Sequence, residues 1–169
     1  MGRKVRRVAK DWEHPKNELG SYIPLLEGSF KEALEEYNER KAEWNDDEAS
    51  FEDDYAEYSE NRELWDEEHS VVPEAENYMP NWTEAERTHI QMYEDCSEGT
   101  PISPVMETSE ELASWLADNN ASAFAGMTAT YDEWLATINR GWAPSAIFSP
   151  MTGMQSGVTA MHDDGEDRE

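Results

Sequence analysis

Residues 30–44, FKEALEEYNERKAEW, are followed by a second copy of the same pattern at residues 51–65, FEDDYAEYSENRELW. The two copies align without gaps at an offset of 21 residues, which is three heptads. In each copy Phe, Tyr and Trp recur at seven-residue steps and therefore fall on one face of a helix. The repeat predicts two helical segments, each with one aromatic face.

Two folds satisfy this repeat: one long helix, or a helical hairpin that turns through residues 45–49. Each copy begins with its own capping signal, Ser29 with Glu32 and Ser50 with Asp53. The intervening Asn-Asp-Asp has poor helix propensity and brings like charges together. We therefore expect a hairpin whose aromatic faces pack on each other, and keep the long helix as the alternative.

Short elements are predicted beyond residue 87. Alternating apolar residues predict one strand over 89–93 and a second over 102–106, joined by turn residues at 97–101. A further short strand is expected at 146–148. These strands are expected to be short and antiparallel.

Two helices are predicted in the same part of the chain. Thr108 with Glu111 and Thr130 with Glu133 are capping pairs, and Gly141 ends the second helix. The predicted fold class is therefore α+β: an acidic, aromatic-striped helical hairpin or long helix, plus a small module of short antiparallel strands with two or three helices.

These elements divide the chain into five parts. They are a basic extended arm (1–26), the acidic helical hairpin (27–70), a connector (71–87), a small α+β module (88–158) and an acidic mobile tail (159–169). We expect a fragment of about residues 80–160 to fold alone.

The composition restricts the function. With 39 acidic and 13 basic residues the net charge is -26, which excludes nucleic-acid binding by phosphate neutralisation and favours a basic partner. Cys96 is the only cysteine, so an internal disulfide or a thiolate zinc cage is excluded. No stretch approaches the roughly 20 apolar residues of a spanning helix. We expect a folded cytoplasmic protein.

Motifs of catalysis and cofactor binding are missing from the sequence. It has no GxSxG, HExxH, P-loop or dinucleotide fingerprint. The acidic run 46–54 lacks the alternating ligands and central Gly of a calcium loop. We therefore expect no enzymatic activity, no cofactor and no metal site.

The acidic density of residues 27–68 suggests the binding surface. This segment has 18 acids and four bases. Folded as a hairpin about 27 Å long, it would present about one net charge per 2 Å, close to the one per 1.7 Å of duplex DNA. A single helix of about 60 Å would present about one per 4 Å. The predicted partner-binding residues are Glu35, Glu36, Glu39, Asp46, Asp47, Asp53, Asp54 and Glu57.

Several blocks of the chain resemble an uncharacterised family of proteins encoded by tailed bacteriophages and prophages. The blocks are RKVRRVAKDWEHP (3–15), SEGTPISPVM (97–106), EELASWLADN (110–119), MTATYDEWLATI (127–138) and RGWAPSA (140–146). Longer relatives carry CxxC zinc-ribbon insertions between these blocks, which this chain lacks, so no zinc role is carried over. The resemblance implies a phage accessory gene whose product acts on host machinery.

Charge and resemblance together predict a phage accessory inhibitor. It would act in the host cytosol as a DNA mimic or acidic decoy for a basic groove of a nucleic-acid-binding or defence protein, of the anti-restriction or anti-CRISPR type, without touching nucleic acid itself. The alternative is a scaffolding protein that oligomerises, for example as a homodimer, through the aromatic stripe while its acids keep it soluble.

Overall fold

The computed structural model describes residues 2–48, 71–95 and 99–166. The chain forms two compact units. The first combines Met1–Leu25 with Trp82–Glu169, and the second is Leu26–Asn81. Within the described residues no helix combines the length and the apolar character that crossing a membrane requires.

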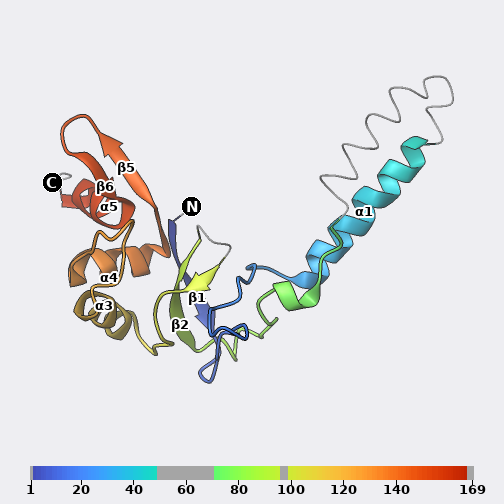
Figure 1. Ribbon diagram of the computed structural model, residues 1–169, viewed down its shortest axis with the longest axis horizontal. Coiled ribbons are helices and arrows are strands. Elements are labelled where there is room, and N and C mark those ends of the chain that lie inside the picture. The colour runs from blue at the N-terminus through green and yellow to red at the C-terminus, as the bar shows by residue number, and fades with distance from the viewer. Residues whose placement is uncertain (1, 49–70, 96–98, 167–169) are drawn as a thin grey trace. The chain divides into compact units, whose positions relative to one another are not determined.

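A four-stranded antiparallel sheet organises the first unit. Its strands are β1 (Gly2–Val8), β2 (His89–Glu94), β3 (Thr100–Pro101) and β4 (Trp142–Pro144), in the order β3-β2-β1-β4. β1 pairs with β2 from Arg3↔Glu94 to Val8↔His89, and on its other side with β4. β1 and β2 lie side by side in Figure 1. The N-terminal residues therefore form a central strand of the sheet.

Basic residues are accommodated in this strand because acids of the same unit pair with them. Buried Arg3 lies 3.3 Å from Glu94, and buried Arg6 lies 3.4 Å from Asp95. Arg6 also donates to the carbonyl of Leu25 at 2.9 Å. The segment that we expected to be a basic extended arm, 1–26, thus contributes a strand whose Arg3 and Arg6 are paired with Glu94 and Asp95.

Two helices cover the sheet where their capping signals predict them. α3 (Ser109–Asp118) begins after Thr108, and α4 (Tyr131–Arg140) begins after a complete Thr130–Glu133 capping box. α4 ends at Gly141, whose φ of 96° suits the left-handed cap. Both predicted helices are confirmed, and they pack side by side (Figure 1). The core that they share with β2 contains Met92, Leu112, Leu116, Trp134 and Ile138.

A β-hairpin and a helix complete the first unit. β5 (Ala146–Ser149) pairs with β6 (Gly153–Ser156), and α5 (Gly157–Glu166) follows at once. The predicted strand at 146–148 is confirmed. Residues 159–166, which we expected in a mobile acidic tail, lie in α5 instead, because Val158 at its start is fully buried in the core.

In the second unit, α1 (Phe30–Glu48) begins after Ser29, whose Oγ accepts from the Glu32 N–H at 3.3 Å. A short 3-10 helix, η1 (Ala75–Asn77), follows later in the chain, and the chain pairs Leu26 with Tyr78 in a parallel bridge. The Phe30 and Tyr78 rings lie 5.8 Å apart.

The predicted helical hairpin is wrong. α1 continues through residues 45–48, where the hairpin was expected to turn. Each Asn or Asp lowers the stability of a helix by only about 0.7 kcal/mol relative to Ala. This is too little to end a helix that has formed over the preceding residues. The second copy of the repeat, residues 51–65, lies outside the described residues.

Candidate functional site

The predicted acidic surface is only partly visible in the structure. Glu35, Glu36 and Glu39 lie close together on α1 and are exposed. Asp46 and Asp47 lie in the last turn of that helix, but their side chains are not described. The remaining predicted residues, Asp53, Asp54 and Glu57, lie outside the described residues. The structure therefore brings together three of the eight predicted carboxylates.

The charge spacing of α1 differs from that of DNA. The helix carries eight acids and three bases in 19 residues, so its net charge of -5 is spread over about 28 Å. That is one net charge per roughly 6 Å, against one per 1.7 Å in duplex DNA. α1 is acidic, but it does not reproduce the DNA-like charge density expected of a hairpin.

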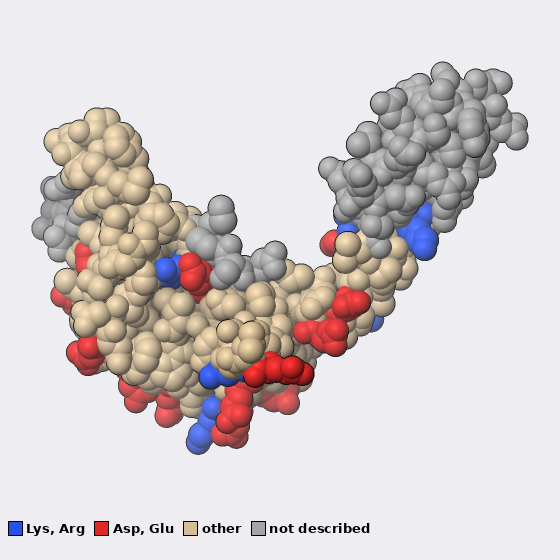
Figure 2. Space-filling model, viewed as in Figure 1, with Lys and Arg blue, Asp and Glu red and all other residues tan. Residues whose placement is uncertain are grey.

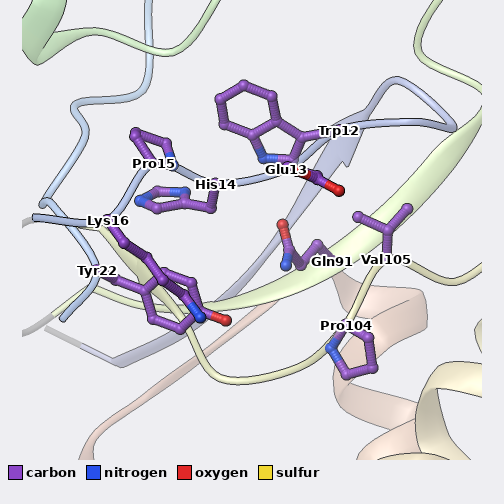
Figure 3. A pocket seen from close by; sticks show the side chains of 9 residues that line it. All are labelled: Trp12, Glu13, His14, Pro15, Lys16, Tyr22, Gln91, Pro104 and Val105. Atoms are coloured by element: carbon purple, nitrogen blue, oxygen red, sulfur yellow. The ribbon is translucent and has the colours of Figure 1, made fainter. Parts of the chain in front are cut away.

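A second candidate is a surface depression in the first unit, which we call the Trp12 hollow (Figure 3). It has a volume of about 610 Å³. The loop after β1 supplies one side of the wall, and β2 with the loop before α3 supplies the other (Figure 3). The lining residues are Trp12, Glu13, His14, Pro15, Lys16, Tyr22, Gln91, Pro104 and Val105.

A chain of hydrogen bonds runs beneath the hollow. Buried His14 donates its Nε2–H to the Ile23 carbonyl at 2.6 Å, and its Nδ1 lies 3.2 Å from the Tyr93 hydroxyl. That hydroxyl also accepts from the Trp12 indole N–H at 3.1 Å and donates to Gln91 Oε1 at 2.8 Å. These bonds hold the loop after β1 against β2.

Burial sets the protonation of this network. It raises the pKa of Tyr93 to about 12, so the hydroxyl stays protonated at neutral pH. Burial also lowers the pKa of His14, with a smaller contribution from the Arg6 charge and against the effect of the Ile23 hydrogen bond. A general acid or base needs a pKa near the working pH and a free approach to substrate. His14 and Tyr93 are therefore better suited to a structural role than to acid–base catalysis. We call their hydrogen bonds with Trp12, Ile23 and Gln91 the Tyr93 clasp.

The described residues contain no group of three His, Cys, Asp or Glu side chains that could hold a metal ion.

The third candidate is the β5–β6 hairpin, which the sequence analysis did not single out as a binding surface. Phe148 is 72% exposed, Met151 94% and Met154 59%. Residues 141–161 include no Asp, Glu, Lys or Arg, in a chain where 31% of residues are charged. The hairpin accordingly has no charged side chains on the face shown in Figure 2. That uncharged run was the sequence signal that could have revealed it.

No family model, curated protein or solved structure matches the chain. The resemblance to tailed-phage proteins stays a prediction from the sequence blocks.

Proposed function

We propose that the protein acts by binding a basic protein through the acidic face of α1, as an accessory inhibitor of a host nucleic-acid-binding protein. The observation that carries the proposal is the exposure of Glu35, Glu36 and Glu39 on one helix of a chain with net charge -26. Such a field attracts a basic surface and accelerates encounter. The phage resemblance supports the choice of a host target.

The acids of α1 are available to a partner at little cost. Lys31 lies 3.4 Å from Glu35, but the side chains are 81% and 59% exposed. An exposed pair of this kind contributes about 0 to 1 kcal/mol, so a partner's Lys or Arg replaces Lys31 without a large penalty. An acidic helix face attracts a basic surface without any DNA-like spacing of its charges.

The test is to replace three carboxylates together. Glu35→Gln, Glu36→Gln and Glu39→Gln in one variant should greatly weaken binding of the immobilised chain to basic proteins of a bacterial lysate. Binding to the parent should fall steeply between about 50 and 200 mM salt, because charges are screened over about 8 Å at physiological ionic strength. A captured protein should also lose its bound DNA duplex when the parent chain is added.

The matched control changes three exposed acids of the first unit: Glu18→Gln, Glu107→Gln and Glu110→Gln. This variant has the same net charge as the α1 variant and should keep most of the binding. Equal loss from the two variants would show that overall charge, and not α1, carries recognition. Capture that is insensitive to salt and to the α1 variant would refute the proposal.

A further inference from the structure

The β5–β6 hairpin is a separate two-stranded sheet, and within the described part of the chain no third strand pairs with it. α5 contacts both of its strands, yet one face keeps large apolar side chains exposed. Two-stranded ribbons are only marginally stable in water unless a further strand or a packed face supports them. Packing of another surface against the exposed face would therefore stabilise the hairpin.

The exposed side chains form one patch. Phe148 lies directly opposite Met154 in the strand register, and side chains of such a pair share a face with their Cβ atoms about 5 Å apart. Met151 lies in the connecting loop and is 94% exposed. Methionine adapts its shape to whatever packs against it. We call Phe148, Met151 and Met154 the hairpin patch.

The charges of the chain indicate what can cover this patch. A basic groove, the partner proposed for α1, gains nothing here because residues 141–161 offer no carboxylate. An anionic membrane surface repels a chain of net charge -26. Two copies of this chain also repel each other wherever their carboxylates approach. The uncharged hairpin is a place where two copies meet without bringing charges into contact.

We propose that two copies of the chain associate through the hairpin patch, around a two-fold axis that places each Phe148–Met154 pair against that of the other copy. A two-fold contact uses the same surface on both subunits. Apolar side chains are well suited to it, because they need no opposite charge or matching donor on the other side.

The area sets the expected strength. At about 200 Å² for a large apolar side chain, the patch exposes roughly 450 Å² per copy, so a pair covers roughly 900 Å². Stable specific interfaces cover about 1,200 to 2,000 Å² in total. An area below that range indicates a weak and reversible dimer.

Sedimentation equilibrium of the full chain tests the proposal. The average mass should rise towards that of a dimer between about 10 and 500 μM protein, and more so in about 500 mM than in about 50 mM salt, because salt screens the repulsion between copies. Binding of a basic partner through α1 has the opposite salt dependence. The failure of one proposal is therefore distinguishable from the failure of the other.

Variants identify the surface. Phe148→Glu places like charges near the two-fold axis and should abolish the dimer, whereas Leu19→Glu, the same change at a residue that is 91% exposed in the first unit, should leave it. An equimolar mixture of Phe148→Glu and Phe148→Lys should dimerise where each alone does not. A parent that stays monomeric at 500 μM in high salt, or equal loss from Phe148→Glu and Leu19→Glu, would overturn the proposal.

Discussion

α1 and α4 begin with the same local signal and differ in what surrounds them. Each follows a hydroxyl residue with Glu three positions later, Ser29 with Glu32 and Thr130 with Glu133. In α4 the aromatic Trp134 is fully buried. In α1 the aromatic Tyr37 is only partly buried. Capping signals and apolar spacing thus locate a helix, whereas burial of its aromatic face depends on partners elsewhere in the chain.

The largest expected difference is between removing β1, which lies in the first unit, and removing α1, which lies in the second. A fragment of about residues 80–160, which the sequence alone led us to expect to fold, should instead remain unfolded, because it lacks the central strand Gly2–Val8 that pairs with both β2 and β4. A chain in which residues 28–77 are replaced by a short Gly-Ser linker should stay folded, because the first unit keeps all its strands. Circular dichroism and urea unfolding measure both. A folded 80–160 fragment would show that β1 is dispensable.

Replacing one aromatic residue in each helix gives the next largest difference. Trp134→Ala should lower the free energy of unfolding by about 3 to 5 kcal/mol, the cost of emptying a well-packed aromatic site. Tyr37→Ala should cost less, about 1 kcal/mol, because Tyr37 is only partly buried. Urea unfolding monitored by tryptophan fluorescence gives both values. Equal costs would mean that α1 is packed as tightly as α4.

The sequence was sufficient where structure is decided locally. The Thr108 and Thr130 caps, the Gly141 stop and the strand at 89–93 depend on neighbours within a few residues, and the structure contains helices and strands there. The packing of these helices against β2 is consistent with their apolar faces, since Trp134 and Leu116 share a core with Met92.

The sequence was insufficient where partners are distant. Strand β1 was missed because Arg3 and Arg6 resemble a solvated basic arm until Glu94 and Asp95 are known to lie beside them. The hairpin over 27–70 was expected because like charges and poor helix formers coincide at residues 45–48, but α1 continues there. The exposure of Glu35, Glu36 and Glu39 was predictable from the sequence. The hairpin patch was not recognised from the sequence.

The Tyr93 clasp adds a pH-dependent effect to the first unit. Unfolded tyrosine releases its proton near pH 10, whereas the pKa of Tyr93 in the fold is raised to about 12. Between these values the unfolded state binds fewer protons, so the free energy of unfolding falls as pH rises, by up to about 2 to 3 kcal/mol. Below pH 10 this contribution is fully present.

Tyr93→Phe isolates that effect. The variant should lose about 1 to 3 kcal/mol at pH 8, because Trp12 and Gln91 lose a buried hydrogen-bond partner. Its further loss between pH 8 and pH 11.5 should be smaller than that of the parent. Urea unfolding at the two pH values measures both quantities, and identical losses in parent and variant would contradict the clasp.

The smallest expected effect comes from the two caps themselves. Thr130→Ala removes the Oγ1 that accepts from the Glu133 N–H and donates to Glu133 Oε2 at 2.9 Å. Loss of such a cap costs about 1 kcal/mol. Because α4 belongs to the core, the free energy of unfolding of the whole first unit should fall by that amount, as measured by tryptophan fluorescence in urea.

Ser29→Ala removes the single 3.3 Å hydrogen bond at the start of α1. Since α1 is largely exposed, its first turn should fray and the helical signal at 222 nm should fall slightly, while the urea midpoint of the first unit stays unchanged. A shift of that midpoint by Ser29→Ala would mean that α1 and the sheet unfold as one cooperative unit, and the contrast between the two helices would then be one of exposure alone.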